Sequence, residues 1–191
     1  MPRVGLTRER IAVAAAGVAD EVGLEKLTLA AVAVRCGVSV PGLFKHVAGL
    51  DAVKRDVAVS AVGEQAGVLA AATSGLAGAP ALSALTAAYR SYAADHPGRY
   101  AASVRAPAPG DTEHAEAGGR AVTVIADALR GYDLHGSDLI HAVRMWRIAC
   151  HGLVSLEAAG GFALAQSLDV TVQRLVDALD HSFRNPPPGS A

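Results

Sequence analysis

Residues 28–47 read TLAAVAVRCGVSVPGLFKHV and predict two short helices joined by a tight turn. The first helix starts after Thr28, a residue type that suits the N-cap position, and ends at Gly37, which readily takes the left-handed conformation of a helix end. The second helix starts after Ser39, again a typical N-cap residue. Two short helices with a glycine turn between them form the helix-turn-helix pattern, whose second helix enters the major groove of DNA.

Pro41 and Gly42 are the two weakest helix-forming residue types, yet they stand where the second helix starts. A missing backbone N–H costs little in the first turn, so Pro41 is tolerated there. Its ring, like the side chain of Val40, can contact a thymine methyl group, and Gly42 lets the backbone approach the duplex. Lys45 and His46 then face a phosphate or a base. A plain helical hairpin would give the same periodicity, so the pattern alone leaves both interpretations open.

The flanking sequence continues in helical periods. Thr7 caps a first helix that ends at Gly23, and a longer helix spans about 50–72. The first amides of that longer helix, at Leu50 and Asp51, are available to a phosphate. The buried face of the second short helix is expected to comprise Leu43, Phe44 and Val47. Further helices are expected at about 81–95, 97–105, 113–131, 137–159 and 168–184.

No segment shows the alternation of a β-strand, so the expected fold is all-α. A three-helix N-terminal domain is joined by a long helix to a C-terminal helical bundle. The expected domains are a helix-turn-helix DNA-binding domain at 1–50, a helical ligand-binding and dimerisation domain at 51–185, and a disordered tail at 186–191.

The composition indicates a globular protein, since 51% of the residues are hydrophobic and the net charge is −1. Residues 1–56 have a slight excess of positive charge, which permits DNA binding without requiring it. Cys36 and Cys150 lie far apart in apolar settings and are expected to be buried thiols. No signal peptide and no apolar run of membrane-spanning length is apparent, which favours a cytoplasmic protein without membrane partners.

Residues 7–56 resemble the N-terminal domain of the TetR family of bacterial transcriptional regulators, because Thr28–Val47 matches the family's pattern in register. The resemblance implies that the partner is double-stranded DNA. Four positions are expected to touch the DNA backbone: Thr28, Ser39, Phe44 and His46. Four others fall on the recognition helix, where bases are read: Val40, Pro41, Gly42 and Lys45.

Two positions depart from the family's usual pattern. Phe44 stands where tyrosine is common, so a hydroxyl contact to phosphate is lost, and Leu50 stands where lysine often begins the fourth helix. Binding is therefore expected to depend on Lys45, His46, Arg35 and backbone amides, with a shallow salt dependence for the family.

The C-terminal part resembles the WHG-type ligand-binding domain of a subset of TetR regulators, through Trp146, His151 and Gly152 in WRIACHGLVSLEAAGGF and through the segment around 88–100. The resemblance implies a helical body that senses a small molecule and dimerises through its last two helices. The residues expected nearest the effector combine apolar walls with a few polar groups. They are Tyr89, Tyr92, Tyr100, Met145, Trp146, His151 and Phe162, for which ordinary core packing is the alternative, and the polar anchor Glu157, for which a hydrogen-bonded structural role is the alternative.

The last two predicted helices each carry an apolar face. Pairing two copies of each across a two-fold axis would give an isologous four-helix contact and place two recognition helices about 34 Å apart. Packing of the last helix on its own body is the alternative. The candidate dimerisation residues are Leu139, Val143, Val172, Leu175, Val176, Leu179 and Phe183.

The sequence does not favour an enzyme. Its seven histidines show no spacing that would converge on one metal ion, and no P-loop or nucleophile elbow is present. The segment DTEHAE at 111–116 mixes ligand types but is expected to be a solvated turn. No cofactor and no metal are expected.

We therefore expect a homodimeric TetR-type repressor, released from a palindromic operator by a small, mostly apolar effector. The alternative is a helical small-molecule-binding protein whose N-terminal domain binds DNA weakly or not at all.

Overall fold

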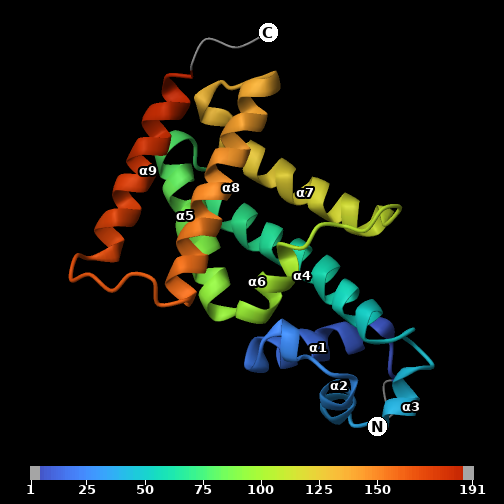
Figure 1. Ribbon diagram of the computed structural model, residues 1–191. Coiled ribbons are helices and arrows are strands. Elements are labelled where there is room, and N and C mark those ends of the chain that lie inside the picture. Colours follow the sequence, from blue (N-terminus) through green and yellow to red (C-terminus); the bar gives the residue numbers. More distant parts are fainter. Residues whose placement is uncertain (1–4, 187–191) are drawn as a thin grey trace. The chain divides into compact units, whose positions relative to one another are not determined.

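The computed structural model describes residues 5–186, and every regular element in that range is helical (Figure 1). This confirms the all-α prediction. The α-helices are α1 (Arg8–Val22), α2 (Leu29–Cys36), α3 (Val40–Leu43), α4 (Leu50–Thr73), α5 (Gly78–Asp95), α6 (Pro97–Ser103), α7 (Thr112–Ala128), α8 (Gly136–Ala158) and α9 (Leu168–Arg184). Two single turns of 3₁₀-helix, η1 (Leu24–Lys26) and η2 (Arg130–Tyr132), complete the set.

The helix ends follow the capping residues that the sequence predicts. The Thr7 hydroxyl accepts a hydrogen bond from the Arg10 amide, and the Thr28 hydroxyl accepts one from the Ala31 amide, at 3.3 and 3.2 Å. Gly37 ends α2 in the left-handed region, at φ 67°. The helix expected at 113–131 is divided, because α7 ends at Ala128 and the chain tightens into η2.

The described chain forms two compact units. The first contains the residues up to Gln65 together with Asp95–Gly119, and the second contains Ala66–Ala94 and the residues from Arg120 onward. The two units are defined by contacts within each of them. The boundary expected at residue 50, between a DNA-binding domain and a ligand-binding domain, stays a prediction. Except for Pro186, the tail expected at 186–191 lies outside the described residues.

The first unit is built on a small apolar core between α1, α2, α3 and the start of α4. Its large, fully buried side chains include Ile11, Leu27, Val32, Leu43 and Val53. Helix α6 packs against α1 in the same unit. The Arg99 amide donates a 2.8 Å hydrogen bond to Asp20 Oδ1, which attaches the first turn of α6 to α1.

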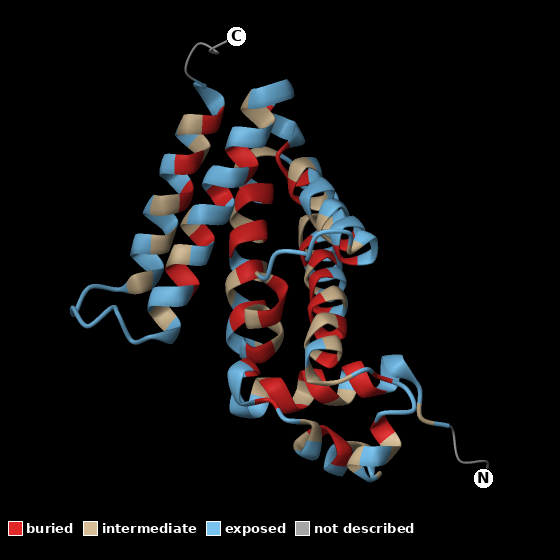
Figure 2. Cartoon of the chain, turned by 45° about the vertical axis from the view of Figure 1, so that its right-hand side comes forward, coloured by how far each residue is buried: buried red, intermediate tan, exposed pale blue. Residues whose placement is uncertain are grey.

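The second unit is a bundle with Trp146 at its centre, fully buried on α8. Its indole Nε1 donates to Thr86 Oγ1 at 3.1 Å, and the Thr86 hydroxyl donates to the Leu82 carbonyl at 2.9 Å. Helix α9 carries its buried residues along one side and its exposed residues along the other (Figure 2). Its buried side chains are Val176, Leu179 and Phe183.

No helix among residues 5–186 has both the length and the apolar character needed to cross a membrane.

Candidate nucleic-acid interface

Helices α2 and α3 form the helix-turn-helix in the first unit, and they are fixed by their turn and by two anchors. Val38 donates its amide to the Ala33 carbonyl at 3.0 Å, which closes the turn after Gly37. Leu43 and Val47 are buried in the core, and the Val47 amide donates to the Leu43 carbonyl at 3.1 Å. The segment between these anchors is therefore held on the surface.

The first turn of α3 and the segment between the two anchors lie at the surface. Lys45 and His46 are exposed and make no ion pair with any residue in the range 5–186, so both are available to an anion. Pro41 is exposed in the first turn of α3, while Val40 and Gly42 are partly exposed.

Phe44 corrects the expectation of a three-residue buried face on α3. Its side chain is 55% exposed, whereas Leu43 is buried. The helix is only four residues long, so the 3.6-residue period carries Leu43 and Val47 inward and turns position 44 outward. Phe44 is thus an exposed aromatic residue beside Lys45, and it stays a candidate for DNA contact.

Ser39 and Thr28 occupy equivalent N-cap positions but use their hydroxyls differently. Thr28 caps α2 with its side chain, whereas Ser39 makes no side-chain cap bond to α3. Both residues are exposed. The Ser39 hydroxyl is therefore the better placed of the two to accept a new partner without loss of a helix cap.

Arg35 is engaged by a neighbour that the sequence did not indicate. Its Nη2 donates to both carboxylate oxygens of Glu21 on α1, at 2.6 and 2.7 Å. The hydrogen bond to Glu21 raises the pKa of Arg35 above its ordinary value, so the guanidinium stays charged. A phosphate bound through Arg35 Nη2 would have to replace this ion pair.

Leu50 begins α4, and its side chain packs against the core of the first unit. It follows Gly49, whose φ of 152° turns the chain into the helix. Any contact of position 50 with a phosphate would therefore use the backbone amide and not the side chain.

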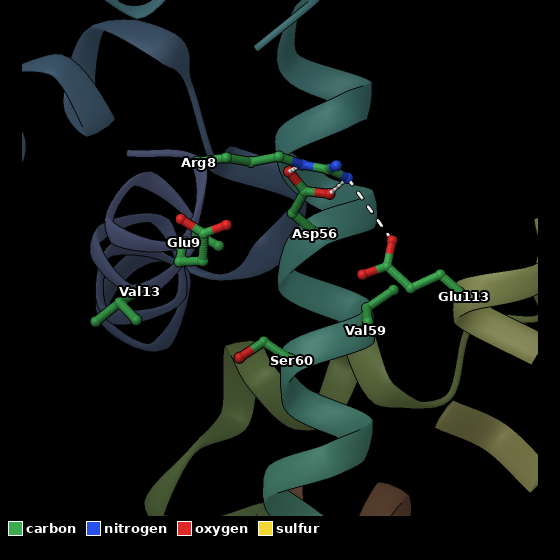
Figure 3. Close-up of a pocket in the computed structure, with 8 residues that line it drawn as sticks. Arg8, Glu9, Val13, Asp56, Val59, Ser60 and Glu113 are labelled. Atoms are coloured by element: carbon green, nitrogen blue, oxygen red, sulfur yellow. Dashed lines mark hydrogen bonds and ion pairs between the residues drawn. The ribbon is translucent and has the colours of Figure 1, made fainter. Parts of the chain in front are cut away.

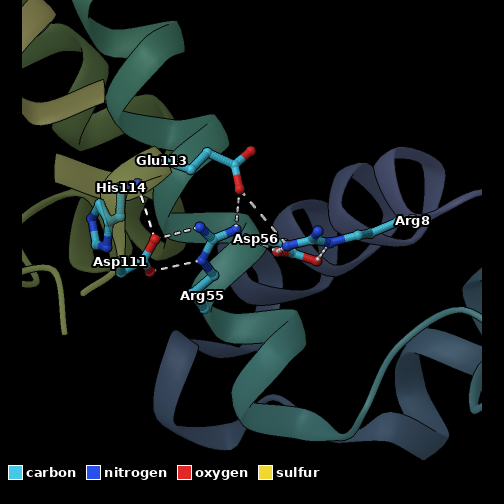
Figure 4. A network of polar contacts seen from close by, with 6 residues as sticks. All are labelled: Arg8, Arg55, Asp56, Asp111, Glu113 and His114. Atoms are coloured by element: carbon cyan, nitrogen blue, oxygen red, sulfur yellow. Dashed lines mark hydrogen bonds and ion pairs between the residues drawn. The ribbon is translucent and has the colours of Figure 1, made fainter. Parts of the chain in front are cut away.

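Behind the helix-turn-helix, an ion-pair network joins α1, α4 and the start of α7 (Figure 4). Arg8 Nε donates to Asp56 at 2.6 Å. Arg55 Nε donates to Asp111 at 2.8 Å, and Arg55 Nη1 donates to Glu113. The hydrogen bonds from Arg55 hold the pKa of Asp111 well below its ordinary value, so this pair remains ionised.

This network corrects the expectation of a solvated turn at 111–116. Asp111 accepts a 3.1 Å hydrogen bond from the His114 amide at the start of α7, and the His114 side chain is buried, with 4% exposed. The sequence contained no signal for it, since Arg55 and Asp111 are 56 positions apart and only the packing of α4 beside α7 joins them. No group of metal-binding side chains is found within residues 5–186.

With this geometry described, comparison with known proteins identifies the family. Residues 82–179 match the model of the tetracyclin repressor-like C-terminal domain, which is about half of the chain. The chain belongs to the TetR family. It is accordingly a helix-turn-helix transcriptional regulator, a class that acts on DNA, and not an enzyme.

Named relatives of this TetR-family chain are regulators as well. An uncharacterized HTH-type transcriptional regulator of Mycobacterium tuberculosis, Rv0681, is 36% identical over 157 residues, which is 81% of this chain and 72% of the relative. Another, YobS of Bacillus subtilis, is 29% identical over 184 residues, covering 93% and 95%. The solved structure of SCO7222, a TetR from Streptomyces coelicolor, has the same fold, with a TM-score of 0.55 and 19% identity over 96% of this chain and 90% of that one.

The predicted effector residues of the TetR-family chain fall into different environments. Tyr89, Tyr92 and Trp146 are buried in the second unit, with the Tyr89 and Trp146 rings edge to face at 5.2 Å. Tyr100 belongs to the first unit and is partly exposed. The remaining apolar or aromatic candidates, Met145, His151 and Phe162, are exposed.

Glu157, the predicted polar anchor, has a structural partner in the second unit. Arg90 donates two hydrogen bonds to its carboxylate, at 2.6 and 2.8 Å, and a third to Asp169 at 2.7 Å. These bonds join α5, α8 and the first turn of α9. The two bonds to Glu157 also lower its pKa, because two N–H groups of the Arg90 guanidinium donate to the ionised carboxylate.

A pocket of about 200 Å³ lies elsewhere, in the first unit between α1 and α4 (Figure 3). Arg8 and Asp56 meet in it, and Glu113 reaches it from α7. None of the eight predicted effector residues lines this pocket.

The predicted dimerisation residues of α9 pack largely within their own chain. Val176, Leu179 and Phe183 are buried, and the rings of Phe183 and Tyr132 meet edge to face at 5.5 Å. Val143 on α8 is buried too, whereas three candidates remain partly exposed: Leu139, Val172 and Leu175. For the buried residues of α9, the sequence left open that this helix packs on its own chain. In the single chain, these residues pack in this way.

Proposed function

We propose that this TetR-family regulator is a homodimeric repressor, which occupies a palindromic operator and leaves it when a small, mostly apolar effector binds. The observation that carries the proposal is the exposed Lys45, which lies in the turn directly after the recognition helix α3, between the buried anchors Leu43 and Val47. An exposed cation on a backbone segment fixed at both ends suits the contact that a helix-turn-helix makes with the major groove.

The DNA contacts fall into two groups. Lys45, together with Val40, Pro41 and Gly42, would meet base edges, because Val40, Pro41 and Gly42 form the first turn of α3 and Lys45 is exposed in the turn that follows this helix. The helix-turn-helix would be positioned on phosphates by His46, Ser39 and Thr28, with Phe44 and the amide of Leu50 beside them. Arg35 would join them through Nη2 only after exchanging Glu21 for a phosphate.

A dimer would use the outward face of α8. Ile148 is 73% exposed near the middle of that helix, and Met145, Leu156 and Ile140 are exposed as well. His141, Met145, Ile148, Gly152 and Ser155 follow each other at spacings of four and three, the repeat of a helix seam between two copies. Pairing this face across a two-fold axis, flanked by Leu139, Val172 and Leu175, would bury it.

The effector site would lie in the second unit, as in the WHG-type domain that the sequence resembles. Tyr89, Tyr92 and Trp146 supply aromatic surface there, and opening of their packing would create an apolar site. The alternative function is a small-molecule-binding protein with weak DNA binding. It is favoured by the near-neutral charge and by Phe44 and Leu50 in place of polar phosphate contacts.

A gel-shift experiment separates these two functions. The protein is titrated onto the intergenic DNA upstream of its own gene at low salt, with unrelated DNA of the same length as competitor. A repressor gives a sequence-selective shift. A folded protein that shifts neither DNA selectively would support the alternative function and contradict the repressor.

Lys45→Ala is the first prediction for the repressor. It should lower operator affinity at least tenfold and leave the melting temperature and dimer mass unchanged, because Lys45 is exposed and makes no ion pair within residues 5–186. Fluorescence anisotropy measures the affinity.

Arg130→Ala is the charge-matched control, since it removes one exposed positive charge from the second unit. It should leave operator affinity within twofold of the wild type. Equal affinities of wild type and Lys45→Ala would mean that α3 does not read this operator.

A further inference from the structure

Five basic side chains of the first unit are paired with carboxylates of the same unit. The ion pairs are Arg8 with Asp56, Arg35 with Glu21, Lys54 with Glu25, Arg55 with Asp111, and Arg99 with Asp20. A cation that faces a carboxylate attracts a phosphate less strongly than a free cation does. The first unit thus neutralises part of the positive charge that favours DNA binding.

The pair of Arg35 and Glu21 differs from the other four in its exposure. The Arg35 side chain is 42% exposed and that of Glu21 is 60% exposed. In each of the other pairs, at least one of the two side chains is no more than 15% exposed. An exposed ion pair contributes little to stability, whereas breaking a pair with a buried member leaves an uncompensated buried charge. Arg35 can therefore exchange its partner at low cost.

Arg35 is also the paired cation that lies on the helix-turn-helix. It is in the last turn of α2, two residues before Gly37. Lys45, the other lysine or arginine of residues 28–47, makes no ion pair within residues 5–186. Of these two cations, Lys45 is available to DNA at once, whereas Arg35 is held by Glu21.

Two features of α1 hold the Arg35 guanidinium in place. Its Nη2 donates to Glu21 Oε1 at 2.7 Å and to Glu21 Oε2 at 2.6 Å. Gly17 lies one helical turn earlier on the same face of α1, and a Cβ atom built there would lie 3.1 Å from Arg35 Nη1. Both terminal nitrogens thus lie against α1, and a phosphate that reaches Nη2 must displace the carboxylate.

We propose that Glu21 is an intramolecular competitor of DNA, which holds Arg35 in the free protein and competes for it with a phosphate of the duplex. When DNA binds, the phosphate takes the place of the carboxylate at Nη2, and Glu21 is left as an unpaired negative charge near the DNA backbone. Both effects lower the affinity. The competition is strongest at low salt, because salt also screens the pair of Glu21 and Arg35, and it therefore makes the affinity fall less steeply with salt.

This role of Glu21 rests on the proposed contact between Arg35 and a phosphate. A phosphate contact requires duplex DNA but no particular sequence. The competition is therefore expected on any duplex, whether or not the protein recognises an operator.

A purely structural role of the ion pair predicts a change of the opposite sign. If Glu21 served only to hold α2 against α1, loss of its charge would loosen the helix-turn-helix and weaken DNA binding. If Glu21 competes with DNA, loss of its charge frees a cation and strengthens binding. The sign of the change in affinity separates the two roles.

The test uses Glu21→Gln, which removes the charge and keeps a side chain of similar size. Fluorescence anisotropy measures the affinity of the full-length protein for a labelled duplex of random sequence at several salt concentrations. We expect binding to be about fivefold tighter at low salt, the upper end of the effect of an exposed ion pair. The fall of affinity with salt should be steeper, with the slope increased by up to about 0.9, the value for one further neutralised phosphate.

Arg35→Met tests whether this gain depends on Arg35. The substitution removes the guanidinium and keeps much of the apolar stem. In the Arg35→Met background, Glu21→Gln should change the affinity by less than about twofold, because no cation is left to be released.

Glu25→Gln is the control for the loss of one negative charge from the same unit. Glu25 is exposed, and its partner Lys54 lies 3.9 Å away with a largely buried side chain, so its release offers no exposed cation to DNA. This variant should bind the duplex within about twofold of the wild type. Thermal melts followed by circular dichroism check that every variant is folded.

Any of three results would overturn the competition. The first is that Glu21→Gln binds the duplex no better than the wild type, including the case in which neither binds. The second is an equal gain in the Arg35→Met background, and the third is an equal gain from Glu25→Gln. A gain that requires Arg35, in a protein that gives no selective gel shift, would support the competition and contradict the repressor, so the two proposals can fail separately.

Discussion

Gly98 lies against the backbone of α1, where a side chain has no room. A Cβ atom would come within 2.1 to 2.5 Å of the backbone of Ala19 and Asp20. The same turn of α6 donates the Arg99 amide to Asp20, so the close approach and the hydrogen bond support each other. The absence of a side chain at Gly98 thus allows α6 to pack against the backbone of α1 in the first unit.

Gly98→Ala should therefore destabilise the protein by about 3 kcal/mol, since overpacked sites must displace backbone. Urea unfolding followed by circular dichroism measures the loss. Gly63→Ala, at an exposed position inside α4 where a Cβ would meet no atom within 4 Å, should be neutral or stabilising by about 0.5–1 kcal/mol. Similar losses for both variants would contradict the packing role of Gly98.

At Phe44, a single missing hydroxyl group is expected to affect DNA binding. It is exposed beside Lys45 but has no hydroxyl to donate to a phosphate. Phe44→Tyr should tighten operator binding about tenfold, because a hydrogen bond to a charged group contributes about 1.5 kcal/mol. The slope of affinity against salt should stay the same, since a neutral hydroxyl releases no counterion.

Fluorescence anisotropy at several salt concentrations tests this gain. Phe162→Tyr is the control, an exposed phenylalanine of the second unit, and it should have no effect. Unchanged affinity for Phe44→Tyr would mean that position 44 does not reach the DNA backbone.

At the scale of elements, α9 shows that an amphipathic pattern does not identify the surface against which its apolar face packs. Its apolar stripe could pack on its own chain or on a second copy, and the two cases look alike in sequence. In the structure, Tyr132 donates its hydroxyl to Asp180 at 2.7 Å and packs against Phe183, which holds α9 on its own unit. On α8, by contrast, the four large apolar residues Ile140, Met145, Ile148 and Leu156 are exposed.

Arg90 connects three elements, and its contribution should depend on pH. Glu157 has a lowered pKa in the folded protein, so its ion pair stabilises the fold fully above the unfolded pKa, near 4.3, and loses that effect as pH falls through the folded pKa. Arg90→Met keeps much of the apolar stem and removes the charge. The variant should be less stable by about 1 kcal/mol at pH 7, with the difference shrinking below pH 4.

Urea unfolding of both proteins at pH 7, 5 and 3 measures this difference. A stability difference that is constant from pH 7 to pH 3 would show that Arg90 acts through packing and not through the carboxylate.

At the scale of the whole molecule, the proposed dimer depends on a face that is open in the single chain. Ile148→Asp puts a charge at the centre of that face without entering the core, because the residue is 73% exposed. It should convert the dimer to a monomer in sedimentation velocity and weaken operator binding, since one subunit contacts one half-site.

Val34→Asp is the matched control, an 81% exposed valine on α2 in the first unit. It should leave the dimer mass unchanged. A dimeric Ile148→Asp protein would place the interface on another surface.

The sequence by itself determined the local structure, because capping and periodicity act over a few residues. Thr7, Thr28 and Gly37 mark helix ends in the sequence and do so in the structure. The family could also be predicted from Thr28–Val47, since a helix-turn-helix lies within one short segment. The match over residues 82–179 confirmed it.

The tertiary structure alone decided which distant residues meet and which apolar faces are already covered. Arg55 with Asp111, Arg90 with Glu157 and Gly98 with Ala19 are contacts between elements far apart in the chain. Position 44 faces solvent because it follows the single turn of α3 and lies between the buried residues Leu43 and Val47. Such features follow from packing in three dimensions, and a periodic pattern along one helix carries no information about its neighbour.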